Sequence, residues 1–212
     1  MSAKSNIAMQ PVAAEALVPA GDRRSEISMS VGEKNSRTLS DVIILPASAE
    51  DIPRIADIYA YHVRNGLATF ETDPPSLKEM TERRVELRAH GFPYLVAFRN
   101  DRLIGYAYAG PYRQRWAYRF TVEDAIYMHP MYVGKGIGRL LLDALIHECE
   151  LRGYRQIIAV IGDSANKASI NVHARSGFAG VGVFRSVGFK HGRWVDTVLM
   201  QRSLGAADPA PP

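Results

Sequence analysis

The segment Val133-Gly134-Lys135-Gly136-Ile137-Gly138-Arg139 places three glycines at alternate positions directly before the strongest helical pattern in the chain. Apolar residues then recur at helical spacing from Ile137 to Leu145, which predicts a helix that ends at about Gly153. Glycine lets the backbone approach a ligand closely, and a helix N-terminus attracts phosphate oxygens. The segment therefore predicts an anion-binding turn or a plain structural turn. It matches neither the dinucleotide fingerprint nor the GxxxxGK[ST] phosphate loop.

Strand and helix patterns on both sides of this turn determine the predicted fold class. Strands are expected at about 42–45, 94–98, 103–109, 119–129, 157–161 and 194–201, with a hairpin at Arg99–Arg102. Further helices are expected from Ser48-Ala49-Glu50-Asp51, which resembles a capping box, to before Gly66, and over about 76–90 and 166–176. The apolar run at 157–161 is typical of a strand buried on both faces, which implies some parallel pairing. The predicted class is α/β (α+β), with a mostly antiparallel sheet.

Composition limits the domain count and the kinds of partner. Core patterning covers residues 41–204 of the 212, so we expect one domain between an N-terminal tail, 1–40, and a C-terminal tail, 205–212. The net charge is +4, but the basic residues form no run that would indicate nucleic acid or a membrane surface as a partner. The single cysteine, Cys149, excludes an internal disulfide. No membrane-length apolar run or signal-peptide pattern is found, so we expect a soluble, cytoplasmic protein.

Several short motifs together resemble a known family. They include Thr121-Val122-Glu123, Ala159–Gly162, Asn166–Ser169, Gly188–Trp194 and Ala68–Glu71. With the glycine turn, these motifs resemble the phosphinothricin and methionine sulfoximine acetyltransferase branch of the GCN5-related N-acetyltransferase (GNAT) superfamily. The resemblance covers about residues 42–204. It implies a twisted sheet flanked by helices, acetyl-CoA as acetyl donor, a small amino-acid-like amine as acceptor, no metal, and a homodimer.

The resemblance also implies two catalytic residues. Transfer to an amine requires a base, because an α-amino group is mostly protonated at neutral pH. Glu123 matches the glutamate of this branch and would accept the proton, directly or through a water. The alternative for Glu123 is a structural role, as a buried carboxylate paired with an arginine such as Arg119. His173 matches a histidine near the departing CoA sulfur and would assist proton transfer, or it is a structural hydrogen-bonding group.

Acetyl-CoA is expected to lie on the glycine turn, on the following helix and on one strand. Asn166 is expected to contact the pantetheine or a phosphate and also to cap its own helix. Val133 departs from the family pattern, which has Gln or Arg at this position. We expect CoA still to bind, with a lower affinity. The cofactor-binding residues implied by the resemblance are Ile126, Tyr127, Met128, Val133, Gly134, Lys135, Gly136, Ile137, Gly138, Arg139, Asn166 and Ser169.

An arginine and aromatic cluster before Glu123 is expected to bind the carboxylate of the substrate. Guanidinium groups pair with carboxylates through two parallel hydrogen bonds, although such a cluster is equally often a dimer contact. The substrate-binding residues expected are Phe70, Glu71, Tyr108, Arg113, Arg115, Arg119 and Thr121.

The remaining histidines show no metal-ligand spacing. Two other functions stay open, namely acetylation of a peptide N-terminus or polyamine, and a non-catalytic acyl-CoA sensor.

Overall fold

The computed structural model describes Leu39 and residues 41–207. The expected tail over residues 1–40 lies outside the described residues, apart from Leu39, and so do residues 208–212 of the expected C-terminal tail. The strands are β1 (Val42–Pro46), β2 (Tyr94–Arg99), β3 (Arg102–Pro111), β4 (Thr121–Met128), β5 (Gln156–Gly162), β6 (Ala179–Lys190) and β7 (Arg193–Ser203). The α-helices are α2 (Ile52–Asn65), α3 (Leu77–Ala89), α4 (Ile137–Leu151) and α5 (Lys167–Arg175).

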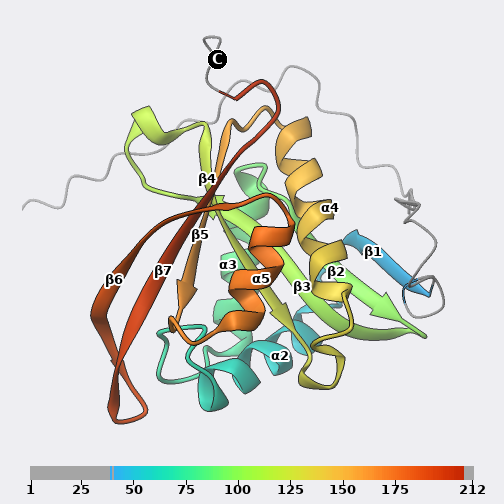
Figure 1. The fold of residues 1–212 in the computed structure, drawn as a ribbon. Helices are drawn as coiled ribbons and strands as arrows, with labels where there is room; N and C mark the ends of the chain where they lie inside the picture. Colours follow the sequence, from blue (N-terminus) through green and yellow to red (C-terminus); the bar gives the residue numbers. More distant parts are fainter. Residues whose placement is uncertain (1–38, 40, 208–212) are drawn as a thin grey trace, which may run out of the picture.

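The described strands form a single mixed sheet in the order β1-β2-β3-β4-β5-β7-β6 (Figure 1). Every neighbouring pair is antiparallel except β4 and β5, which run parallel and are connected through α4. This arrangement confirms the predicted class, including the parallel pairing expected beside the helical crossover. The parallel pair lies at the middle of the sheet, so both of its strands have helices nearby (Figure 1).

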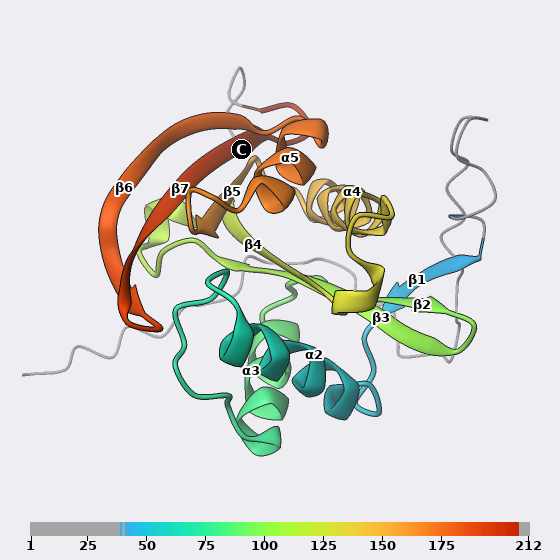
Figure 2. The same ribbon diagram turned by 60° about the horizontal axis from the view of Figure 1, so that its bottom comes forward.

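Helices cover both faces of the sheet, with α4 and α5 on one face and α2 and α3 on the other (Figure 2). Each face has its own apolar cluster. The α4 side buries Leu141, Leu142 and Leu145 against the sheet, and the α2 side buries Ile55 and other residues. These fully buried side chains fix both layers by removing apolar surface from water.

The strand β6 is the element that the sequence patterns do not predict. Eleven of its twelve residues are at least partly exposed, so no alternation of buried and exposed residues marks it. Gly180, Gly182 and Gly188 further weaken the strand signal, and the pairing register shifts beside them. The expectation that 157–161 is buried on both faces is also wrong at Val160, which is 39% exposed.

Turn chemistry explains several element boundaries. The hairpin between β2 and β3 is confirmed, since Asn100 and Asp101 both have positive φ, at 48° and 57°. Half of the capping box predicted at Ser48 forms, since the Ser48 hydroxyl donates to a carboxylate instead of accepting from a helix amide. Asp51 accepts hydrogen bonds at 2.8 Å from both the amide and the hydroxyl of Ser48. Its side chain therefore holds the preceding turn instead of a helix amide, and α2 begins at Ile52.

Candidate active site

The central feature of the site is the divergence of β4 from β5. The two strands pair only from Thr121 with Gln156 to Asp124 with Ala159. Beyond that point β4 pairs only with β3, and β5 pairs only with β7. The rest of β4, Ala125–Met128, therefore turns one hydrogen-bonding edge toward an opening in the sheet. Free backbone N–H and C=O groups in such an edge can bind an extended ligand as an added strand would.

A cavity of about 290 Å³ lies in this opening. Its walls come from β3, β4, β5, β7, α5 and the loop between α2 and α3. The expected site residues that line it are Glu123, His173, Ile126, Tyr127, Asn166, Ser169, Phe70 and Tyr108. The sequence spreads these residues over about half of the chain, and the fold brings them together. The cavity does not include the other expected residues.

Glu123 points to the side of the opening that is covered by α2 and α3. Alternate residues of a strand face opposite sides, and Tyr108 pairs with Ala125, two positions from Glu123. Burial raises the pKa of Glu123 to about 7, the nearby Asp124 carboxylate adds to the rise, and Arg113 opposes it. Among the described residues Glu123 has no ion-pair partner within 4.0 Å. This carboxyl group can therefore exchange a proton close to neutral pH.

His173 lies on the opposite, α5 side of the opening, where it is almost completely buried. Its Nε2 is 3.0 Å from Oδ2 of Asp124, and its Nδ1 is 2.8 Å from the carbonyl oxygen of Ser169. The Phe178 ring packs edge-on against the imidazole, 5.0 Å between centroids. Burial by itself would lower the pKa of His173, but the hydrogen bond and charge of Asp124 raise it above its ordinary value.

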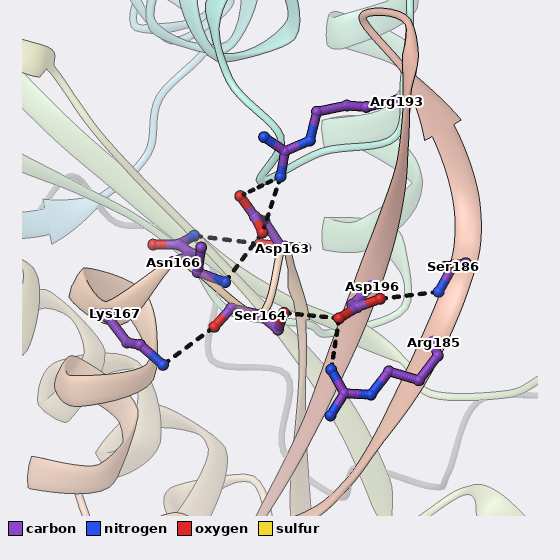
Figure 3. Close-up of polar contacts among 10 residues, drawn as sticks. Asp163, Ser164, Asn166, Lys167, Arg185, Ser186, Arg193 and Asp196 are labelled. Carbon is purple, nitrogen blue, oxygen red and sulfur yellow. Dashed lines mark hydrogen bonds and ion pairs between the residues drawn. The ribbon is translucent and has the colours of Figure 1, made fainter.

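Asn166 is presented by a turn between β5 and α5 that a polar network holds (Figure 3). Its side chain caps α5 by accepting from the Ser169 amide at 3.2 Å, which confirms the capping role. Ser164 donates to Asp196 on β7 at 2.7 Å, and Asp196 also accepts from the Ser186 amide on β6 at 2.9 Å (Figure 3). The β6–β7 hairpin thus fixes the turn that carries Asn166.

The glycine turn lies next to the N-terminus of α4. Gly134 and Gly136 have φ of 77° and 79°, which favour glycine, and Gly136 is the residue before the first helical turn. The Arg139 amide bonds to the Gly136 carbonyl at 3.1 Å, but the Ile137 and Gly138 amides before it have no backbone partner among the described residues, so they can bind an anion together with the helix dipole. Val133 is 49% exposed, and Arg139 forms an ion pair with Asp143, 3.4 Å between Nε and Oδ2.

The arginine cluster lies on the segment between β3 and β4, outside the cavity. Arg113 and Arg115 are exposed. Arg119 stacks on the rings of Trp116 and Phe120, with its guanidinium carbon 5.0 and 4.4 Å from their centroids, and so it is not a partner of Glu123. Of the cluster, Arg113 is the member whose charge acts on Glu123.

The loop that follows α2 forms one wall of the cavity. Thr69 bonds to the Tyr59 hydroxyl, 2.9 Å between oxygens, and its carbonyl accepts from the buried Lys190 ammonium at 2.8 Å. The Phe70 ring lies against Gly188, where a Cβ would come within 2.4 Å of Cε2. Two further residues expected in the site are elsewhere. Glu71 forms an ion pair with Arg83, 2.7 Å between oxygen and nitrogen, and Thr121 does not line the cavity.

Asp124 is the site residue that sequence reasoning missed. It follows Glu123 directly, so the strand turns its side chain to the other face of the sheet. No signal in the sequence links it to His173, because 49 positions separate the two residues. Only the packing of α5 against β4 joins them.

The comparisons identify the class of protein. The model of the Acetyltransferase (GNAT) family matches residues 55–178, and the chain belongs to this family. A phosphinothricin N-acetyltransferase from Alcaligenes faecalis is 55% identical over 159 residues, which are 75% of this chain and 81% of that protein. An L-methionine sulfoximine/L-methionine sulfone acetyltransferase from Salmonella typhimurium is 37% identical over 161 residues, 74% of this chain and 92% of the relative.

A solved structure shows the same fold. The GNAT superfamily phosphinothricin acetyltransferase from Sinorhizobium meliloti, crystallised in complex with AcCoA, is 46% identical, with a TM-score of 0.79. The match covers 81% of this chain and 93% of the neighbour. In the part of the chain that the structure describes, no helix is long and apolar enough to cross a membrane, and no cluster of three metal-ligating side chains occurs.

Proposed function

We propose that this protein transfers the acetyl group of acetyl-CoA to the α-amino group of phosphinothricin, methionine sulfoximine or methionine sulfone. The observation that carries the proposal is Glu123, a carboxyl group with a pKa raised to about 7 in a cavity where the two central strands part. The family and the relatives named above support the donor and the acceptor class.

Glu123 is the general base. A free α-amino group has a pKa of about 8, so most of it carries an extra proton at neutral pH. A carboxylate whose conjugate acid has a pKa of about 7 is a stronger base than an ordinary glutamate and can take that proton directly or through a water. The amine then attacks the thioester, and the thiolate that leaves needs a proton, which His173 supplies through the Ser169 hydroxyl from the other side of the opening.

Acetyl-CoA supplies an activated acetyl group, and residues of three elements fit it. The edge of β4 that β5 leaves unpaired, over Ile126, Tyr127 and Met128, offers backbone groups to an extended pantetheine, apart from the Met128 carbonyl, which lies 2.8 Å from Nε2 of His62. The amides at the start of α4, with Gly134 and Gly136, suit the pyrophosphate. Asn166 and Ser169 face the same cavity from α5, and backbone amides near the thioester stabilise negative charge on its oxygen.

The acceptor lies on the other side of the sheet, near Phe70 and Tyr108. Arg113 is the arginine that we assign to the acceptor carboxylate, because it is exposed and its charge reaches Glu123. The exposed Arg115 and the stacked Arg119 remain candidates for the same role. Thr121 and Glu71 would act through their neighbours, since neither lines the cavity.

Two subunits form the working enzyme in this proposal. The outer strand β6 exposes Val181, Phe184, Val187 and Phe189, each by more than half. An exposed apolar edge strand of this kind favours pairing with a second copy of the chain. Light scattering during size-exclusion chromatography should give a dimer, and Phe184→Glu should give monomers; a wild-type monomer at high concentration contradicts the proposal.

The free, buried thiol of Cys149 suits a reducing compartment such as the cytoplasm.

The deciding experiment measures thiol release from acetyl-CoA with a panel of amines. We expect the fastest release with phosphinothricin and the two methionine derivatives. Faster release with a polyamine or a peptide N-terminus would favour another acceptor. Tight binding of CoA without release by any amine would favour an acyl-CoA sensor. Glu123→Gln should lower turnover by at least about tenfold with little change in acetyl-CoA binding.

A further inference from the structure

The buried pair of Asp124 and His173 lines the reaction cavity without an assigned task for the aspartate. Both side chains are buried, 3% exposed for His173 and 1% for Asp124. A buried carboxylate costs several kcal/mol of solvation free energy unless it is paired, so a purely apolar contact would be the cheaper way to pack α5 on β4. The pair therefore indicates a function.

Hydrogen bonding determines the protonation of the imidazole. The carbonyl oxygen of Ser169 faces Nδ1 and can only accept, and the Asp124 carboxylate faces Nε2 at 3.0 Å. Both ring nitrogens then act as donors, which is the pattern of an imidazolium. The edge of Phe178 holds the ring plane.

We propose that Asp124 is a positioning residue for acetyl transfer, which keeps His173 protonated and fixes its ring on the α5 side of the opening. This inference rests on the acetyl transfer proposed above. The Ser169 hydroxyl lies 3.4 Å from Nδ1 and lines the same cavity, so it connects the ring to the reaction space. The proton balance closes: the Ser169 hydroxyl gives its proton to the thiolate, the Nδ1 proton leaves its hydrogen bond to the Ser169 carbonyl and moves to the Ser169 hydroxyl oxygen, and His173 becomes neutral while its Nε2–H stays on Asp124.

The charges around the pair predict a distinctive pH dependence. From β4, the Asp124 charge raises the pKa of Glu123, whereas Arg113 opposes the rise. From α4, burial raises the pKa of Cys149 to about 12, so this thiol stays neutral. Turnover should rise as Glu123 loses its proton and fall as His173 loses its own. Asp124→Asn removes the charge that raises both pKa values, so both limbs of the profile should move to lower pH.

The first test uses the unaltered protein. Nitrogen-15 NMR should show both ring nitrogens of His173 protonated in a sample whose pH is above about 6.5, the ordinary pKa of histidine. A neutral ring at that pH would overturn the proposal. This measurement does not depend on any variant folding.

The second test compares variants in the thiol-release assay. Asp124→Asn should lower kcat by about tenfold or more, with the KM for acetyl-CoA changed less than about threefold. His173→Gln combined with Asp124→Asn should be no slower than His173→Gln, because the pair acts as one unit. Ser176→Ala is the matched control, since Ser176 joins α5 to Asp143 at 2.6 Å outside the cavity, and its kcat and pH profile should equal those of the wild type.

Two results would refute the role of Asp124. One is an Asp124→Asn enzyme with the kcat and the pH profile of the wild type. The other is additive loss in the double variant. A wild-type protein that releases no thiol with any amine would instead refute the acetyl transfer itself, so the two failures can be told apart.

Discussion

Glu123→Gln tests the base assignment through activity and stability together. The variant keeps the shape of the side chain but cannot ionise. The pKa of Glu123 is about 7 in the folded protein against an ordinary 4.5, so the folded state disfavours the charged form. This difference between the two pKa values corresponds to a free-energy cost of about 3 kcal/mol for ionising Glu123 in the folded state, at 1.36 kcal/mol per pKa unit. Since the group is partly open to solvent, screening reduces the effect to on the order of 1–2 kcal/mol.

The sign of this effect follows from linkage. A carboxyl group whose folded pKa is raised favours folding while it is protonated, and that contribution is lost as pH rises from about 4.5 through about 7. Above that window Glu123→Gln should therefore be more stable than the wild type, while its turnover falls by at least about tenfold. A gain in stability with a loss of turnover cannot result from misfolding.

The assay is thiol release across the pH range, with thermal unfolding of the same samples. Wild-type kcat/KM should fall about tenfold per pH unit below about pH 7, and the variant should lose this limb. Glu82→Gln is a matched control, because Glu82 lies exposed on α3 and, among the described residues, its one ion pair is the i,i+4 pair with Lys78. A Glu123→Gln enzyme with wild-type turnover, or one that is less stable above pH 7, would refute the reasoning.

Two further substitutions test the donor and acceptor sides separately. Gly136→Ala forces a side chain into a φ of 79° at the start of α4 and should raise the KM for acetyl-CoA several-fold; Gly153→Ala, with φ of 77° at the far end of the helix, should leave it unchanged. Gly188→Ala places a Cβ 2.4 Å from the Phe70 ring, so it should raise the KM for the acceptor with little change in the KM for acetyl-CoA. In Gly180→Ala, the matched control, the new Cβ meets no atom within 4 Å, and neither KM should change. Steady-state kinetics with each substrate varied in turn measures both, and equal effects in target and control would contradict them.

Local sequence patterns determined most of the secondary structure. The periodicity from Ile137 and the glycine turn before it fix α4, because a helix face and its N-terminal geometry depend on neighbouring residues. The resemblance carried by short motifs pointed to Glu123 and His173 as well. Each of these signals depends on residues that are close together in the chain, so it can be found from the sequence without the fold.

Tertiary structure decided what no local pattern encodes. The strand β6 has no amphipathic signal, since its exposed side chains and glycines do not alternate, and only pairing with β7 makes it a strand. The separation of β4 from β5 after Asp124 is likewise a property of two segments far apart in the chain. The partnership of Asp124 with His173 depends on how α5 packs on the sheet, because a contact over 49 positions follows from the fold and not from spacing.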